Sequence, residues 1–145
     1  MKSEELTTHF QQAWNTLDVS YITNSLHNDF EYGSQMVLSN IYGKENYLEY
    51  LKAKFAAIKL SGEKVTARIG KYRDKYCLLI TQELSEPEFD GASIKIEDKF
   101  EPKLIKERKG VLLLEFKDDL ISKAHMCSIA PTENDLEFNL FYNVQ

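Results

Sequence analysis

Residues 110–129, GVLLLEFKDDLISKAHMCSI, decide the fold, because they read as the only unbroken hairpin in the chain. The apolar run over residues 111–116 is too short for a typical helix and is typical of a central strand covered on both faces. A polar break over residues 117–119 leads into a second strand over residues 120–129. One face of that strand carries Leu120, Ser122, Ala124 and Met126, and the other carries Ile121, Lys123, His125 and Cys127. Neither face is plainly the core face.

Length and composition predict one globular domain over residues 1–145, with 43% hydrophobic residues. A chain of this size buries roughly 68–70% of its unfolded surface, so it needs neither a disulfide nor a structural metal. The formal net charge of −5 argues against nucleic-acid and anionic-membrane partners. Residues 1–12 contain no apolar stretch, and no segment approaches the ~20 apolar residues of a membrane span. These features predict a cytoplasmic protein.

The two cysteines, Cys77 and Cys127, lie in predicted strands and lack CxxC spacing. This pattern is typical of small reduced core residues, and we favour that interpretation. The alternative is a nucleophilic thiol at Cys127 with His125 as its base. Residues at i and i+2 of a strand point the same way but rarely form good hydrogen bonds, so the alternative is the weaker one.

Apolar residues at helical spacing predict three helices. Ser3 can cap the first, whose buried stripe consists of Leu6, Phe10, Ala13, Trp14 and Leu17. Asp18 can cap a second, shorter helix that carries Val19, Ile22 and Leu26 on one side. The longest helix covers residues 44–59, and Ser61 and Gly62 end it.

Short apolar or alternating runs predict the strands that precede the main hairpin, at residues 30–34, 36–38, 65–70 and 76–82. The pattern fails over residues 84–109, which we interpret as an insertion that is either functional or mobile. Residues 131–145 are interpreted as a C-terminal arm, either an added edge strand or a segment packed on a partner. The basis is the alternation of Leu136, Phe138, Leu140 and Tyr142.

This order of elements is that of an α+β protein, and three stretches carry a family resemblance. AWNTLDVSYITNSLHNDFEY, residues 13–32, resembles the helix pair and first strand of the nuclear-transport-factor-2-like superfamily, also called SnoaL-like or ketosteroid-isomerase-like. IYGKENYLEYLKAKF, residues 41–55, resembles its glycine-led third helix, and GVLLLEFKDDLISKAHM, residues 110–126, its last two strands. Such motifs specify a fold well and a function poorly.

The resemblance implies a cystatin-like cone, in which three N-terminal helices pack against a strongly curved mixed sheet around a pocket. It also implies a homodimer formed through the outer face of the sheet. The residues implied to line the pocket and bind a small apolar ligand are Phe10, Trp14, Tyr32, Ser34, Leu51, Phe55, Leu112 and Leu114. The family register turns Lys123, His125 and Cys127 inward and is our working expectation. A shift by one residue turns in Ala124 and Met126 instead, and this alternative stays open.

Ketosteroid isomerase chemistry requires a carboxylate base and two acidic hydrogen-bond donors. The resemblance puts the family's tyrosine donor at Phe10, its base at Ser34 and its acidic donor at Leu112. None of these side chains can perform the role, because phenylalanine and leucine donate no hydrogen bond and serine is a very weak base. This activity is therefore not expected, unless the alignment slips by a residue near Glu31.

His125 is the remaining catalytic candidate, because an imidazole titrates near neutral pH. Related cyclases and dehydratases place an acid or a histidine on the matching strand. The alternative is a structural histidine that is half-buried or faces a dimer interface. His9 and His27 are expected at the surface, and the three histidines lack metal-ligand spacing, so we predict no metal and no cofactor.

Three functions stay open. The first is a small-molecule-binding SnoaL-like protein with an apolar pocket. The second is an isomerase, cyclase or dehydratase that acts on a polycyclic or polyketide-like substrate through His125. The third is a non-catalytic dimeric interaction module that works through its outer sheet face, residues 84–109 or residues 131–145. A pocket filled by Phe10, Trp14 and Phe55 would favour the third function, whereas an open pocket would favour the first two.

Overall fold

The computed structural model describes residues 2–96 and 99–138. The elements are, in chain order, α1 (Lys2–Thr16), the 3-10 segment η1 (Val19–Tyr21), β1 (Leu26–Ser34), β2 (Val37–Tyr42), α2 (Lys44–Ser61), β3 (Lys64–Tyr72), β4 (Lys75–Ile96), β5 (Lys99–Lys117), β6 (Leu120–Cys127) and the 3-10 segment η2 (Glu133–Asp135). None of the helices in these ranges is long and apolar enough to cross a membrane.

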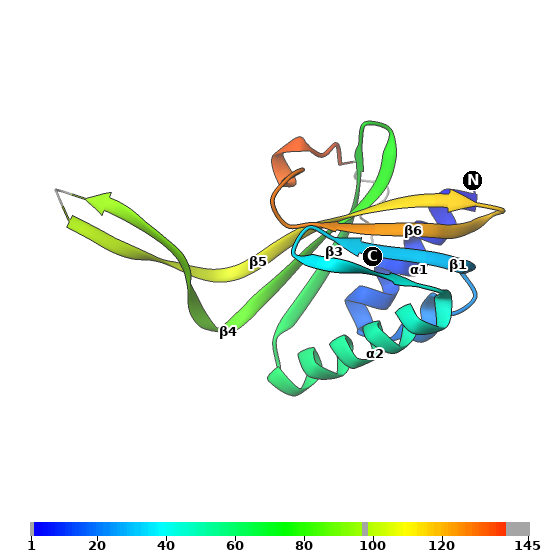
Figure 1. Cartoon of the computed structure of the whole chain (residues 1–145), viewed down its shortest axis with the longest axis horizontal. Helices are drawn as coiled ribbons and strands as arrows, with labels where there is room; N and C mark the ends of the chain where they lie inside the picture. Colours follow the sequence, from blue (N-terminus) through cyan, green and yellow to red (C-terminus); the bar gives the residue numbers. More distant parts are fainter. Residues whose placement is uncertain (1, 97–98, 139–145) are drawn as a thin grey trace.

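One curved six-stranded sheet carries the fold, with the strand order β2-β1-β6-β5-β4-β3 (Figure 1). β1 and β6 run parallel, and the other neighbouring strands run antiparallel. Apolar residues of α1 and α2 join those of one sheet face in a single core. This face is called the inner face below, and the opposite face the outer face. The predicted α+β class with a curved mixed sheet is confirmed.

The hairpin that decides the fold is confirmed as β5 and β6, closed by a two-residue turn at Asp118 and Asp119. Both turn residues have positive φ, 55° and 59°, a conformation that aspartate tolerates better than most residues and that matches the twist of the strands. A second two-residue turn, at Arg73 and Asp74, joins β3 to β4. The expectation that residues 110–129 contain the only unbroken hairpin is therefore wrong.

The prediction of three N-terminal helices is also wrong, because the second is only the three-residue segment η1. The carboxylate of Asp18 accepts a hydrogen bond from the backbone N–H of Ser20, as a helix cap does, but the turn is not continued. Thr23, Asn24 and Ser25 follow it and are poor helix formers. Leu26, which was assigned to this helix, begins β1 and is buried.

A β-bulge near the start of β6 resolves the ambiguity of its two faces. Phe116 pairs with Ile121 while Glu115 pairs with Lys123, so Ser122 is an extra residue that forms a β-bulge. The bulge exchanges the two faces, and as a result Ile121 before it and Ala124 after it are both buried in the inner core. The working expectation that Lys123, His125 and Cys127 point inward is therefore wrong, and the alternative with Ala124 and Met126 is correct.

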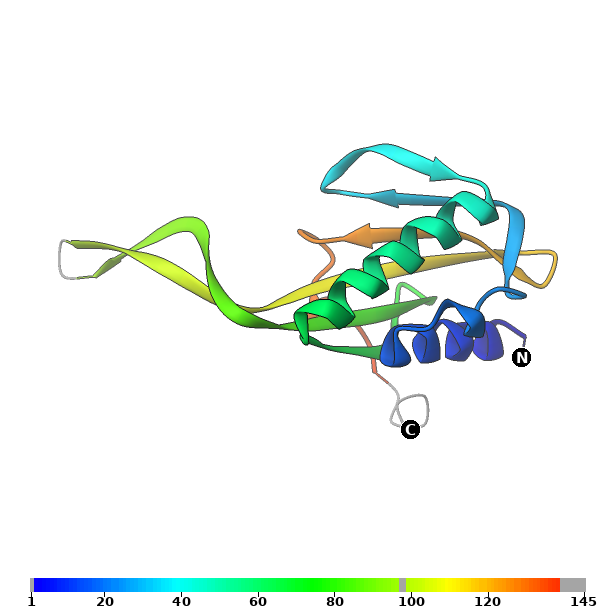
Figure 2. The same cartoon turned by 90° about the horizontal axis from the view of Figure 1, so that it is seen from below.

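Residues 84–109 continue β4 and β5 as a two-stranded extension that projects from the rest of the sheet (Figures 1 and 2). We call residues 84–96 and 99–109 the ribbon. The sequence pattern of this stretch did not indicate two pairing strands, because mixed charges interrupt the alternation of apolar residues. Ala67, Ile80 and Gly110 lie in one row across β3, β4 and β5, near the level at which the ribbon leaves the sheet.

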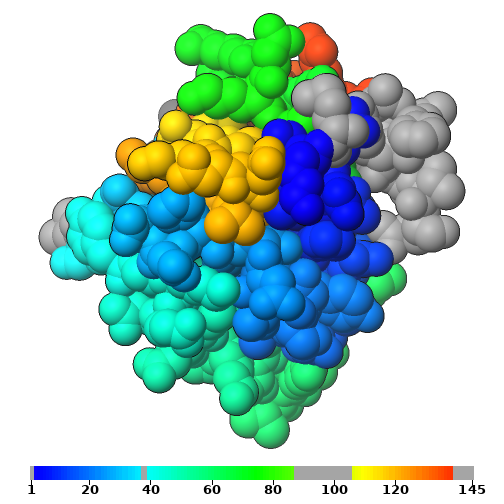
Figure 3. Space-filling view, turned by 90° about the vertical axis from the view of Figure 1, so that its right-hand side faces the viewer, coloured from blue at the N-terminus to red at the C-terminus, as the bar shows by residue number. Residues whose placement is uncertain are grey.

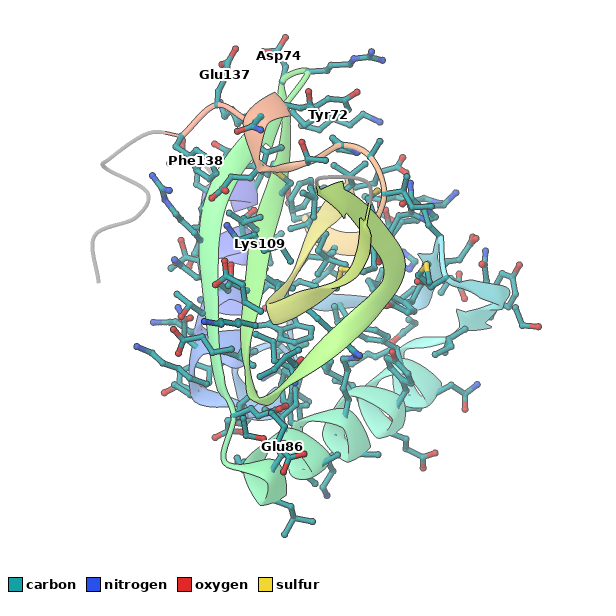
Figure 4. All side chains as sticks on the ribbon, turned by 90° about the vertical axis from the view of Figure 1, so that its left-hand side faces the viewer. Tyr72, Asp74, Glu86, Lys109, Glu137 and Phe138 are labelled. Carbon is teal, nitrogen blue, oxygen red and sulfur yellow. The ribbon has the colours of Figure 1, made fainter. Side chains whose placement is uncertain are left out.

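The C-terminal segment, residues 131–138, lies on the outer face of the sheet. Glu137 and Lys71 exchange two backbone hydrogen bonds of 2.8 Å, which adds a single bridge to the edge of β3. Leu136 and Phe138 pack on a cluster formed by Cys77, Leu79, Val111 and Cys127. Figure 4 shows Glu137 and Phe138 beside the β3–β4 turn, near Tyr72 and Asp74. The predicted edge addition thus exists as one bridge, and Leu140 and Tyr142 lie outside the described residues.

Candidate functional site

Seven of the eight residues predicted to bind a ligand meet in the inner core. Each is at most 7% exposed, and they are Phe10, Trp14, Tyr32, Leu51, Phe55, Leu112 and Leu114. Spacing of four residues aligns Phe10 with Trp14 on α1, and Leu51 with Phe55 on α2. The eighth residue, Ser34, ends β1 and is half-buried, and its hydroxyl accepts a hydrogen bond of 3.2 Å from the backbone N–H of Met36.

Aromatic rings fill the space between the two helices. The ring centroids of Trp14 and Phe55 lie 5.0 Å apart with the rings nearly perpendicular, and those of Phe10 and Tyr47 lie 6.4 Å apart in a similar arrangement. Phe10 is fully buried and Phe55 is 2% exposed. These edge-to-face contacts are favourable for aromatic pairs, so this part of the interior is packed by the protein's own side chains.

Three tyrosines form a cluster where β1 meets α2, and we call Tyr32, Tyr47 and Tyr50 the tyrosine cluster. Their ring centroids are separated by 5.1 Å between Tyr32 and Tyr47, 5.4 Å between Tyr32 and Tyr50, and 6.1 Å between Tyr47 and Tyr50. Tyr47 is fully buried, whereas Tyr50 is only half-buried. The cluster therefore reaches from the core toward the surface.

Burial makes these phenols donors rather than bases. It raises the pKa of Tyr47 well above the usual value near 10, and the neighbouring hydroxyls of Tyr32 and Tyr50 raise it further. Burial, followed by the proximity of Tyr50, likewise raises the pKa of Tyr32. Both groups are protonated and neutral at physiological pH, so they can donate hydrogen bonds but cannot accept a proton from a substrate.

Two polar atoms of the interior, the indole Nε1 of Trp14 and the hydroxyl of Tyr47, are buried without a hydrogen-bond partner. The buried polar side chains in the described part of the chain behave differently. Gln11 donates to the carbonyl of Ala67 at 3.1 Å, and Thr7 donates to the carbonyl of Ser3 at 2.7 Å. An unpaired buried donor costs about 1–3 kcal/mol, so each of the two atoms requires an explanation.

Tyr47 and Tyr50 are not among the ligand-binding residues predicted from the sequence. The available signal was the spacing of Tyr47, Leu51 and Phe55, which places Tyr47 on the buried stripe of α2. A sequence does not reveal which buried hydroxyl lacks a partner, because that depends on contacts between distant elements.

The interior offers no acid–base pair of the kind that ketosteroid isomerases use. Among the described residues, the buried polar side chains are Thr7, Gln11 and Ser25, and none of them is a carboxylate or an imidazole. Phe10 and Leu112, which the resemblance assigns to the two donor positions of that family, are fully buried. A carboxylate does meet a phenol at the border of the core, where the hydroxyl of Tyr76 donates to half-buried Glu4 at 3.0 Å.

His125 lies on the outer face, exposed, and opposite Gly33 of β1. A Cβ atom on Gly33 would lie 2.9 Å from Nδ1 of His125 and 3.1 Å from Oδ1 of Asn40, so the glycine makes room for both side chains. Nearby, Glu31 accepts a hydrogen bond from Asn40 at 2.8 Å and lies 3.8 Å from Nζ of Lys123. An acid–base role of His125 on an interior ligand therefore has no geometric support.

Both cysteines are free and buried, which confirms the structural interpretation of Cys77 and Cys127. Burial raises the pKa of the Cys77 thiol to about 12 and raises that of Cys127 as well. A thiol with a raised pKa is a poor nucleophile at neutral pH. In the part of the chain that the structure describes, no three His, Cys, Asp or Glu side chains come together as metal ligands would.

The sequence matches no protein-family model and no curated protein. Among solved structures, a ketosteroid-isomerase candidate from Kribbella flavida has a TM-score of 0.62 at 15% identity, over 91% of this chain and 81% of the other. An NTF2-like protein of unknown function from Mesorhizobium loti also has a TM-score of 0.62, at 10% identity, over 89% of this chain and 92% of the other. A candidate polyketide cyclase from Xanthomonas campestris has a TM-score of 0.55 at 10% identity, over 87% and 89% of the two chains.

Identities this low carry no information on activity, but the coverage and the agreement between neighbours establish the architecture. The chain has the fold of the NTF2-like superfamily.

Proposed function

We propose that the protein binds an uncharged, largely apolar small molecule that carries hydrogen-bond acceptors, held in the interior by Trp14 and Tyr47. The observation that carries this proposal is the pair of buried donors without partners. They come from opposite walls, α1 and α2, which meet through the contact between Phe10 and Tyr47. A ligand oxygen that accepts from either atom removes the cost of its burial.

The chemistry of the surroundings supports an uncharged ligand. The described buried side chains include no Lys, Arg, Asp or Glu, so an ionised ligand would enter without a counter-charge, which is costly. The names of the similar structures, a ketosteroid-isomerase candidate and a polyketide-cyclase candidate, suggest oxygenated ring compounds as the class to test first. The filled interior implies that aromatic side chains such as Phe55 move when a ligand enters.

Fluorescence gives a direct test, because Trp14 is the single tryptophan of the chain. Purified protein is unfolded, freed of any bound molecule, refolded and titrated with a neutral polycyclic ketone and with the hydrocarbon of the same ring skeleton. One hydrogen bond is worth about 0.5–1.5 kcal/mol, so we expect the ketone to bind about 2–12 times more tightly. Native mass spectrometry before unfolding checks for a co-purified molecule.

The matched variant for this test is Tyr47→Phe, which keeps the ring and removes the hydroxyl. It should bind the hydrocarbon as before and lose the preference for the ketone. Equal affinity of the native protein for both probes would contradict a donor role for Tyr47. Failure of both probes to change Trp14 fluorescence, together with the mass of the chain alone in native spectra, would sink the proposal and leave ordered water as the partner of the two donors.

The filled interior also favours a second candidate, a non-catalytic interaction module. Phe10, Trp14 and Phe55 occupy the region expected to hold a ligand, which is the arrangement that points to this function. Its working surface would then lie elsewhere on the molecule, and the test is whether the protein associates with a partner while the interior stays closed to both probes.

A further inference from the structure

The ribbon has two edges without a neighbouring strand. β3 pairs with β4 only as far as Lys64 and Glu83, and β6 pairs with β5 only as far as Cys127 and Val111. Beyond these points the described parts of β4 and β5 pair only with each other, out to Ile96 and Lys99. Figures 1 and 2 show the ribbon leaving the helices and the other strands behind. The ribbon therefore extends beyond the elements that cover the sheet in the body.

The described part of the ribbon consists of two strands only. A two-stranded hairpin alone in water is at best marginally stable. Its sequence nevertheless contains seven large apolar residues, namely Leu84, Phe89, Ile94, Ile96, Phe100, Leu104 and Ile105. The 24 residues of the ribbon, 84–96 and 99–109, are comparable to the roughly 20–30 residues that each partner contributes to a standard protein interface. The length and composition therefore suit a surface that another chain covers.

Hydrogen bonds fix the root of the ribbon on both of its strands. The carboxylate of Glu63, which precedes β3, accepts hydrogen bonds from Nε2 of Gln82 at 2.7 Å and from the backbone N–H of Ser85 at 2.9 Å. On the other strand, Nζ of Lys109 donates to Glu133 of η2 at 2.9 Å. Figure 4, which looks along the ribbon, labels Lys109 and Glu86 near this root. The body therefore sets the direction in which the ribbon projects.

The two strands of the ribbon carry opposite charge. Residues 84–96 contain three acidic residues, Glu86, Glu88 and Asp90, and one basic residue, Lys95. Residues 99–109 contain five basic residues, Lys99, Lys103, Lys106, Arg108 and Lys109, and two acidic ones, Glu101 and Glu107. Two ribbons can lie face to face and point in the same direction, related by a twofold axis parallel to their length. In that arrangement the acidic strand of each ribbon covers the basic strand of the other. This arrangement is self-complementary, as a twofold interface must be.

The outer face of the sheet is less suited to the same task. Its apolar part, the cluster of Cys77, Leu79, Val111 and Cys127, is already covered by Leu136 and Phe138 of the same chain. The neighbouring part displays Lys123 and His125, which are exposed. The apolar part of this face is therefore already covered within one chain.

We propose that the ribbon is the interaction surface through which two copies of this chain associate, ribbon against ribbon, with the acidic strand of each facing the basic strand of the other. This replaces the dimer through the outer sheet face that the family resemblance implies. The partner is a second copy because the charge pattern complements itself.

The first test is light scattering of the full chain at concentrations of about 1 to 100 µM. We expect about twice the chain mass of 16.8 kDa. A variant in which Asn-Gly replaces residues 84–106 joins Glu83 to Glu107, which already face each other, through a favoured two-residue turn. It should be monomeric and retain the circular dichroism of the body. A monomeric native chain, or a dimeric shortened chain, would overturn the proposal.

Charge reversal provides a second test that does not shorten the chain. Glu86→Lys with Glu88→Lys should weaken the dimer at least tenfold. Adding Lys103→Glu should restore much of the affinity, because Lys103 lies on the same face of β5 as Ile105, the partner of Glu88 in the ladder. The control is Glu45→Lys with Glu49→Lys on exposed positions of α2, which changes the net charge as much as the first pair and should leave the dimer intact. Equal weakening by the control, or no recovery in the threefold variant, would contradict the face-to-face arrangement. The outcome of the ligand-binding test does not depend on whether the ribbon mediates a dimer.

Discussion

Strands β4 and β5 each pass through two very different environments. In the body, consecutive residues of β4 from Tyr76 to Ile80 are all at most 7% exposed, with alternate side chains in the inner core and under the C-terminal segment. In the ribbon, the same strand continues after β3 has ended, and only β5 accompanies it. The two strands stay paired in the ribbon, with two register shifts, so the contrast teaches that pairing and covering are separate requirements of a strand. Local sequence supplies the first, and neighbouring elements supply the second.

The largest effect that distinguishes the two environments is expected along β5. Leu112→Ala removes a fully buried side chain from the body and should lower the free energy of unfolding by about 2–5 kcal/mol. Lys106→Ala changes an exposed ribbon residue of the same strand and should stay within about 0.5 kcal/mol. Urea unfolding of monomeric protein at low concentration measures both. Comparable losses would show that the ribbon and the body unfold as one packed unit.

A smaller effect is expected inside the body at Tyr47. In ligand-free protein, Tyr47→Phe removes an unpaired buried hydroxyl and should raise the free energy of unfolding by about 1 kcal/mol. A loss of stability would instead mean that the hydroxyl has a partner in the ligand-free state.

The same variant carries a pH signature. Because the pKa of Tyr47 is raised in the folded protein, the folded state keeps a proton that the unfolded chain loses above about pH 10. This contribution to stability is complete below pH 10 and is lost as the pH rises further. The difference in melting temperature between the native protein and Tyr47→Phe should therefore be constant from about pH 7 to 9 and should change above about pH 10. A difference that stays constant up to about pH 11 would contradict the burial of this hydroxyl.

The smallest effect should appear at the boundary between body and ribbon. The hydrogen bond from the backbone N–H of Ser85 is the main cause that lowers the pKa of Glu63. The contact is therefore complete above pH 4.5, the ordinary pKa of a glutamate, and weakens as the pH falls below that value. In Glu63→Gln, hydrogen exchange of the Ser85 amide should be faster at pH 7 than in the native protein. The ratio of the two rates should approach one in acid. A ratio independent of pH would mean that Glu63 does not hold the ribbon root as an ion.

Several features of the fold were accessible from local patterns. The stripe that includes Phe10 and Trp14, the glycine after α2 and the turn at Asp118 each depend on residues close in sequence, and each was predicted. The core positions Leu51, Phe55, Leu112 and Leu114 followed from periodicity and from the family resemblance. Residues that could not be assigned were those whose role depends on a distant neighbour, such as Tyr47 and Glu63.

The sequence by itself determined the α+β order and the hairpin of β5 and β6, because side-chain type and short-range spacing are local properties. Tertiary structure alone decided that His125 faces outward. A one-residue bulge at Ser122 exchanges the faces of β6, and the cost of burying an imidazole instead of Ala124 appears only once β1 and β5 lie on either side. Tertiary structure also decided that β4 and β5 extend beyond β3 and β6, because the lengths of β3 and β6 set where the sheet ends and the ribbon begins.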